Sequence, residues 1–101
     1  DIWQETDLPP GVEYVHADIT DPSAVARAMQ GVDYVHHTAA LVPLAKAGRR
    51  YWEVNVDGTR IALEAARRAH VKMFCHMSSS AVFGCPDEMP ITAATPRHPI
   101  E

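Results

Sequence analysis

The sequence predicts an α/β fold in which three parallel strands are joined by crossover helices. Strand-like apolar runs occupy residues 12–16, 32–38 and 73–77. Between them lie two segments with helical periodicity and helix-terminating residues at their ends. Strand, helix, strand, long helix and strand is the order that builds a parallel sheet through right-handed crossovers.

The composition is that of an ordinary globular domain, with 47% hydrophobic and 22% charged residues in a chain of 101. A formal net charge of −4 argues against a nucleic-acid or anionic-membrane surface. We find no apolar run near the roughly 18 residues that a membrane span needs, and no secretory signal at the start. Cys75 and Cys85 make a poor disulfide framework, so we expect reduced thiols in a cytoplasmic protein.

The first strand is predicted over residues 12–16, which alternate apolar and polar side chains as an edge strand does. The helix that follows has clear signals at both ends. Asp21 is a good N-cap, and Pro22 suits the first helical position. The helix is expected to end near Gln30, because Gly31 stands where a left-handed C-terminal residue belongs.

The long helix is predicted over residues 49–70, where apolar side chains recur at spacings of three and four. Its expected buried stripe consists of Trp52, Val56, Thr59, Leu63 and Ala66. Asn55 shares this stripe, and a buried amide without hydrogen bonds costs about 1–3 kcal/mol. Two interpretations stay open: Asn55 holds a neighbouring backbone segment, or it anchors a water or carbonyl in a site.

Small or polar residues follow all three predicted strands: Asp18 after the first, Thr38, Ala39 and Ala40 after the second, and Ser78, Ser79 and Ser80 after the third. Parallel strands end at one edge of the sheet, and ligands bind just outside their carboxyl ends. Alanines allow a flat ligand to approach the backbone closely, and a carboxylate accepts from an amine or a hydroxyl. The sequence therefore predicts a binding site at this edge.

A metal site is not expected. The adjacent His36 and His37 would point to opposite faces of a strand, so they do not readily share one ion.

Four motifs carry a resemblance to a known family: D-I-T-D at 18–21, H-T-A-A at 37–40, N-V-D-G-T at 55–59 and S-S-S-A-V-F-G at 78–84. Their order and spacing resemble those of the extended short-chain dehydrogenases/reductases. The resemblance is closest to the NAD-dependent epimerase/dehydratase family that acts on nucleotide sugars, and it covers about residues 12–101. It implies part of a Rossmann-like, doubly wound parallel sheet that binds NAD or NADP.

The resemblance assigns a cofactor role to residues at the first two strand ends. Asp18 and Ile19 would contact the adenine. Thr38, Ala39 and Ala40 would line the pyrophosphate–nicotinamide side of the cofactor.

The resemblance assigns the remaining roles to the long helix and the third strand end. Asn55 would be the structural and catalytic asparagine, and Ser78 would flank the nicotinamide. Ser79, five residues before Gly84, would be the catalytic hydroxyl that bonds the reacting sugar oxygen while a tyrosine transfers the proton. Ser80 would take that place if the register is off by one.

Two family features are missing from the sequence. The glycine-rich turn that binds a pyrophosphate would come several tens of residues earlier. The catalytic tyrosine and lysine would follow residue 101, and none of Tyr14, Tyr34 and Tyr51 has a lysine four residues later. We therefore expect residues 1–101 to be one partial dinucleotide-binding domain. Its first strand would lack its sheet neighbour, and the isolated polypeptide would be marginally stable and inactive.

The function implied by the resemblance is that of an NAD(P)-dependent nucleotide-sugar epimerase or dehydratase, and a homodimer is the expected assembly of the full-length protein. Two alternatives remain. One is a reductase of the hydroxysteroid-dehydrogenase or dihydroflavonol-reductase type. The other is a non-enzymatic dinucleotide-binding redox sensor, which needs neither Asn55 nor Ser79.

Overall fold

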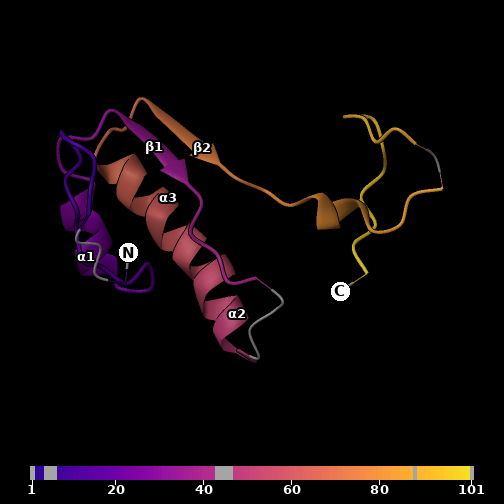
Figure 1. Ribbon diagram of the computed structural model, residues 1–101, viewed down its shortest axis with the longest axis horizontal. Coiled ribbons are helices and arrows are strands. Elements are labelled where there is room, and N and C mark those ends of the chain that lie inside the picture. Colours follow the sequence, from indigo (N-terminus) through magenta and orange to yellow (C-terminus); the bar gives the residue numbers. More distant parts are fainter. Residues whose placement is uncertain (1, 4–6, 43–46, 88, 101) are drawn as a thin grey trace.

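The computed structural model describes residues 2–3, 7–42, 47–87 and 89–100. Figure 1 shows a helical and sheet unit at one end and an irregular C-terminal segment at the other. The elements in chain order are α1 (Pro22–Ala28), β1 (Tyr34–His37), α2 (Arg50–Trp52), the π-helical η1 (Glu53–Gly58), α3 (Thr59–Arg68), β2 (Met73–His76) and the 3-10 helix η2 (Ser80–Phe83).

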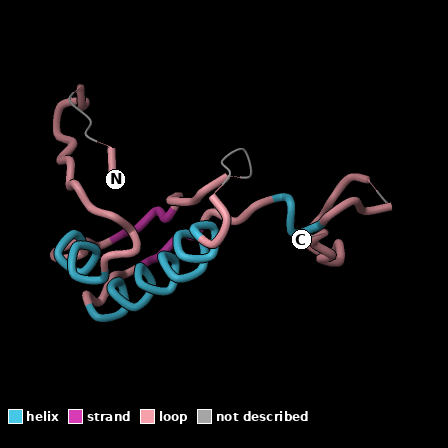
Figure 2. The backbone as a smooth tube through the Cα atoms, turned by 90° about the horizontal axis from the view of Figure 1, so that it is seen from below, coloured by secondary structure: helices cyan, strands magenta, loops and turns pink. Residues whose placement is uncertain are grey.

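Two of the three predicted strands are confirmed. β1 and β2 pair in parallel, with Tyr34 opposite Met73 and His37 opposite His76. The long helix connects them, as a crossover unit requires. Figure 2 shows α1 and the long helix together on one side of the two strands. The carboxyl ends of both strands therefore lie at the same edge of the sheet.

The predicted strand over residues 12–16 is wrong. This segment is a loop, and the described residues contain only the two-stranded sheet of β1 and β2. Two of its hydrogen bonds are with preceding residues: the Tyr14 hydroxyl donates to the Trp3 carbonyl, and His16 Nε2 lies 3.2 Å from the Ile2 carbonyl oxygen. Alternation of apolar and polar side chains is only the local requirement for a strand. The backbone of a strand must also pair with a neighbouring strand, and no described strand lies beside residues 12–16.

α1 begins and ends for the predicted reasons. The Asp21 carboxylate accepts hydrogen bonds from Ser23 N at 2.8 Å and Ala24 N at 3.2 Å, which caps the helix. The helix stops at Ala28, two residues before the predicted end. Gly31 has a φ of +72°, as a left-handed residue after a helix should.

The long helix occupies residues 50–68, but its buried side differs from the prediction. Trp52 and Leu63 are 62% and 48% exposed. The π-helical turn η1 interrupts the regular period on which the predicted stripe depended. Within α3, packing against α1 and β1 then buries the alanine side of the helix, because small side chains allow close approach.

The core is built from small side chains. The buried apolar residues among those described are Ala24, Val25, Val54, Ala62, Ala65 and Ala66. Larger apolar side chains such as Trp3, Tyr34, Trp52, Met73 and Met77 are exposed. Since the favourable free energy of burial scales with apolar area, this core contributes little per residue.

A glycine in η1 brings the loop that carries Asp18 close to the long helix. Gly58 is buried, and a Cβ atom placed on it would lie 2.9 Å from Ile19 Cγ2. The absence of a side chain at Gly58 therefore lets Ile19 pack against the helix. This contact positions the neighbouring Asp18 at the edge of the sheet.

After β2 the chain leaves the sheet. Met77 N donates to the His37 carbonyl at 3.0 Å, which continues the ladder one residue beyond the strand. The following residues run away from the helices toward η2 and the C-terminal segment (Figure 1). Within the described residues, no helix is both long and apolar enough to cross a membrane.

Candidate functional site

A cavity of about 620 Å³ opens beside the carboxyl end of β1. Its walls come from residues 2–3, the loop before α1, one side of α1 and its C-cap, the chain after β1 and the start of the long helix. All five residues predicted for the first two strand ends are among those that line it, and so is the charged Arg50, which was not predicted: Asp18, Ile19, Thr38, Ala39, Ala40 and Arg50. The structure therefore brings the predicted cofactor residues together around one space, although the segment before Asp18 is not a strand.

Asp18 is held from three directions. Its Oδ1 accepts from Thr20 N at 2.8 Å and from Thr20 Oγ1 at 2.7 Å, while its Oδ2 accepts from Arg50 Nη2 at 2.8 Å. The hydrogen bonds from Thr20 are the main reason that the pKa of Asp18 is lowered, and Arg50 adds to them. Asp18 is therefore a carboxylate that only accepts hydrogen bonds.

Asn55 anchors the loop that lines the cavity. Its Oδ1 accepts from Leu41 N at 2.8 Å, and its Nδ2 donates to the Leu41 carbonyl at 3.0 Å. These two bonds support the first of the two interpretations, in which Asn55 holds a neighbouring backbone segment. Leu41 directly follows Thr38, Ala39 and Ala40, so the amide positions the part of the chain that a ligand would approach.

His37 connects the sheet to the same helix. Its ring is buried, and its Nε2 lies 3.0 Å from Thr59 Oγ1, which itself donates to the Asn55 carbonyl at 2.7 Å. The hydroxyl proton is used in that bond, so His37 Nε2 must be the donor to Thr59. Loss of solvation lowers the pKa of His37, and His76, whose ring stacks on it at 5.5 Å, lowers it further.

The two adjacent histidines face opposite sides of β1, as expected, because His37 is buried and His36 is exposed. No group of three or more His, Cys, Asp or Glu side chains within the described part of the chain is arranged to hold a metal ion.

The serines lie apart from this cavity. Ser79 caps η2, and its Oγ accepts from Ala81 N at 3.2 Å. Ser78 and Ser79 are both exposed, and neither is among the described residues that line the 620 Å³ cavity. The three strand ends therefore do not converge as predicted: two of them share the cavity, while the third turns outward after Met77.

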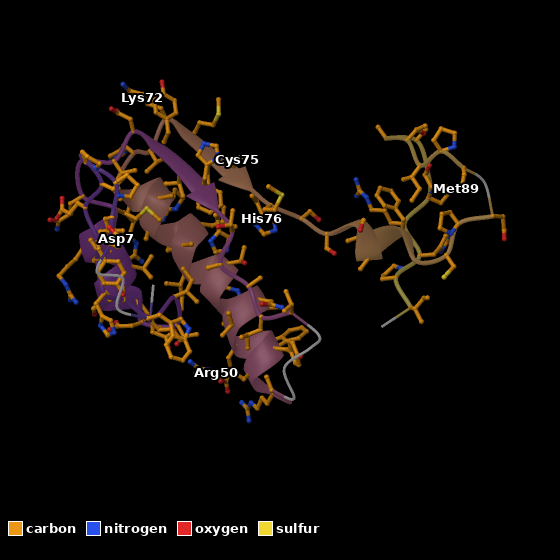
Figure 3. The ribbon with its side chains drawn as sticks, in the orientation of Figure 1. Asp7, Arg50, Lys72, Cys75, His76 and Met89 are labelled. Carbon is orange, nitrogen blue, oxygen red and sulfur yellow. The ribbon has the colours of Figure 1, made fainter. Side chains whose placement is uncertain are left out.

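Arg50 is a charged residue of the site that sequence reasoning missed. It lies 32 residues from Asp18, at the start of the long helix (Figure 3). No local pattern in the sequence distinguishes it from the other arginines of this helix.

A cavity beside the carboxyl end of a parallel sheet, with small residues and one fixed acceptor, is typical of nucleotide-binding α/β proteins. Residues 3–101 match the description of the NAD dependent epimerase/dehydratase family. The chain belongs to this family, which confirms the resemblance seen in its motifs.

Three curated relatives illustrate the range of the family. The chain is 40% identical over 92 residues to the uncharacterized protein y4nG of Sinorhizobium fredii, covering 91% of the chain and 23% of the relative. It is 32% identical to the UDP-glucose 4-epimerase of Streptomyces lividans, over 91% of the chain and 30% of the relative. It is 38% identical to the 3 beta-hydroxysteroid dehydrogenase/Delta 5-->4-isomerase of Mycobacterium tuberculosis, over 72% of the chain and 22% of the relative. The chain thus spans less than a third of each relative.

Solved structures confirm the Rossmann-like fold class. A short-chain dehydrogenase/reductase superfamily protein from Agrobacterium tumefaciens, with bound NAD, has a TM-score of 0.82 at 37% identity, over 91% of this chain and 29% of that protein. The UDP-glucose 4-epimerase from Bifidobacterium longum, in complex with NAD+ and UDP, has a TM-score of 0.73 at 30% identity, over 82% and 26%. The parallel pair of strands and its helices are part of that fold.

Proposed function

We propose that these residues form the central part of the dinucleotide-binding domain of an NAD(P)-dependent nucleotide-sugar epimerase or dehydratase. The observation that carries the proposal is that Asp18 and residues 38–40, which are separate in the sequence, line one cavity beside the sheet edge. The family and the length of the relatives support it, because the chain matches less than a third of each.

The residues around the cavity fit a dinucleotide. Ala39 and Ala40 are small and exposed, so a flat ligand can approach the backbone, and Asp18 provides a fixed acceptor. We assign Asp18 and Ile19 to the adenine and residues 38–40 to the pyrophosphate–nicotinamide side, with Ser78 beside the nicotinamide. When bound, NAD or NADP supplies a hydride acceptor and donor for the reacting carbon.

Ser79 is proposed as the hydroxyl that bonds the reacting sugar oxygen. Its Oγ accepts from Ala81 N, so its own proton remains available for donation to a substrate oxygen. Asn55 is proposed to act indirectly, because its amide holds Leu41 and so fixes the chain that lines the cofactor cavity.

The test uses the full-length protein that contains these residues. We expect it to bind NAD and to interconvert a pair of nucleotide sugars such as UDP-glucose and UDP-galactose. The expected reaction leaves no net NADH, because the hydride is removed and then returned. Absence of dinucleotide binding, measured by calorimetry, would contradict the proposal. Binding without turnover of any nucleotide sugar or ketone would favour the redox-sensor alternative.

A reductase acting on a hydrophobic ketone is the second candidate. The observation in its favour is the 38% identity to the Mycobacterium tuberculosis hydroxysteroid dehydrogenase, against 32% to the Streptomyces lividans epimerase. The two candidates differ in net redox chemistry. Reduction of a ketosteroid by the protein would consume one NADH for each ketone reduced, and the fall in absorbance at the nicotinamide band measures this directly.

We further propose that the full-length protein is a cytoplasmic homodimer, while the isolated 101-residue polypeptide is marginally stable and inactive. The small core and the exposure of Trp52 and Met73 support a need for further packing partners. Size-exclusion chromatography tests the dimer, and localisation of the tagged full-length protein tests the compartment. A sharp cooperative thermal transition of the isolated polypeptide, followed by circular dichroism, would count against its marginal stability.

A further inference from the structure

An ion pair at the edge of the cavity joins two parts of the chain that are distant in sequence. Arg50 Nη2 lies 2.8 Å from Asp18 Oδ2, and the two side chains are 46% and 32% exposed. Both residues line the cavity. Arg50 projects from the start of the long helix (Figure 3), so the pair fixes the loop before α1 to that helix.

The hydrogen bonds of Asp18 leave one acceptor position available. A carboxylate offers about four acceptor positions, two on each oxygen. Thr20 uses two positions on Oδ1, through its backbone N–H and its hydroxyl. Arg50 uses one on Oδ2. One position of Oδ2 remains for a ligand that enters the cavity.

An ionised carboxylate selects a ligand by hydrogen-bond polarity. It attracts an N–H or O–H donor and repels a carbonyl oxygen. Adenine presents an exocyclic amine, whereas hypoxanthine presents a carbonyl at the same ring position. A fixed Asp18 can therefore distinguish the two purines, provided that its carboxylate is held in one orientation.

We propose that Arg50 is a positioning residue that orients Asp18 so that the remaining acceptor of Oδ2 recognises the exocyclic amine of a purine base. The inference rests on the proposed function, because it requires a purine dinucleotide in this cavity. The guanidinium is suited to the role because its Nη1 also lies 3.7 Å from Glu53 Oε2. Its planar group is thus held between two carboxylates, which an ammonium group does not reproduce.

The experiment measures dissociation constants of the full-length protein for NAD and for nicotinamide hypoxanthine dinucleotide, at one ionic strength. The variants are Arg50→Gln and Arg50→Lys. The matched control is Arg49→Gln, because Arg49 is the adjacent arginine, its side chain is 92% exposed, and its nearest carboxylate is Glu53 at 3.7 Å. Thermal melting of each variant reports whether it folds.

We expect the unmodified protein to bind NAD about ten-fold or more tightly than nicotinamide hypoxanthine dinucleotide. A difference of this size corresponds to the loss of one hydrogen bond to a charged group. Arg50→Gln should weaken NAD binding and lower this preference by about three-fold or more, since Asp18 is no longer oriented. Arg50→Lys should give an intermediate ratio. Arg49→Gln should leave both constants unchanged.

The ratio of the two constants separates a positioning role from a structural one. Equal weakening of both dinucleotides by Arg50→Gln would overturn the inference, and so would an unmodified protein without any purine preference. If Arg50→Gln does not fold, a folded Arg50→Lys with an unchanged ratio would overturn it. Loss of all dinucleotide binding in the unmodified protein would instead refute the proposed function, and the inference with it.

Discussion

The two halves of the candidate site are built to different degrees. Around the cavity, Asp18 receives three hydrogen bonds, and Asn55 makes two with the backbone of Leu41. At the serine segment (residues 78–80), Ser79 accepts one bond of 3.2 Å from its own neighbouring turn. The cavity half of the candidate site is therefore organised by contacts within these residues.

The two halves of the candidate site differ in what holds them in place. The loop that lines the cavity is held by the long helix, which packs on the sheet. The serine segment follows the sheet but leaves it after Met77 (Figure 1). Substitutions on the cavity side should therefore change binding and stability, whereas substitution of Ser79 should change turnover alone.

The largest expected effect is on the serine side. Ser79→Ala in the full-length protein should lower kcat by about 10²–10⁴-fold, because the substrate oxygen loses its hydroxyl partner during proton transfer. NAD binding should survive. Steady-state kinetics and calorimetry measure the two quantities. Ser80→Ala is the matched control, and turnover of Ser79→Ala within a few-fold of the unmodified protein would remove Ser79 from the mechanism.

Asn55→Leu should destabilise the cavity side. It leaves the N–H and the carbonyl of the half-buried Leu41 without their side-chain partners, at a total cost of about 1–3 kcal/mol. Since the same bonds position residues 38–40, affinity for NAD should fall as well. Denaturant unfolding and calorimetry measure both effects. Unchanged stability and affinity would mean that the amide does not hold this loop.

Gly58→Ala should separate the Asp18 loop from the helix. The added Cβ would lie 2.9 Å from Ile19 Cγ2. The isoleucine side chain branches at its Cβ, so this methyl group cannot easily move away. Overpacking of this kind costs about 1–3 kcal/mol. Chemical denaturation of the full-length protein measures the loss. Gly11→Ala is a useful contrast, since Gly11 has open space around it and its cost arises from its φ of +84° alone.

A small stabilisation is expected away from the site. His70 follows α3 with a φ of +56°, and Val71 N donates to the Ala66 carbonyl at 3.0 Å in a Schellman-type ending. Glycine adopts this conformation without steric cost, so His70→Gly should raise stability by about 0.5–1 kcal/mol. A thermal melt measures the change. A lowered melting temperature would show that the His70 side chain contributes more than its backbone costs.

The pH dependence of stability is expected to be smaller still. The pKa of His37 is lowered from its usual value near 6.5, so the folded state holds the ring neutral. Its contribution to stability is complete above the unfolded pKa and is lost as pH falls through the lower, folded pKa. Unfolding measured between pH 7.5 and about 5 tests this. The change in the free energy of unfolding per pH unit should be smaller in His37→Gln than in the unmodified protein. An identical pH dependence in the two proteins would show that it arises from other groups.

The sequence by itself determined the features that depend on neighbouring residues. Asp21, Pro22 and Gly31 specified both ends of α1 through caps and backbone preferences that act within a few residues. The apolar runs specified β1 and β2, and the crossover between them specified their parallel order. The motifs also singled out five residues, proposed to bind the cofactor, that line the cavity.

Only the tertiary structure decided the features that depend on distant partners. Residues 12–16 have the pattern of a strand but no described strand to pair with. Asn55 finds Leu41 14 residues away, and Arg50 finds Asp18 32 residues away. Local periodicity cannot specify such pairs, because their geometry arises from how the helix packs on the sheet. The same packing buried the small alanine side of α3 and left the larger Trp52 and Leu63 exposed.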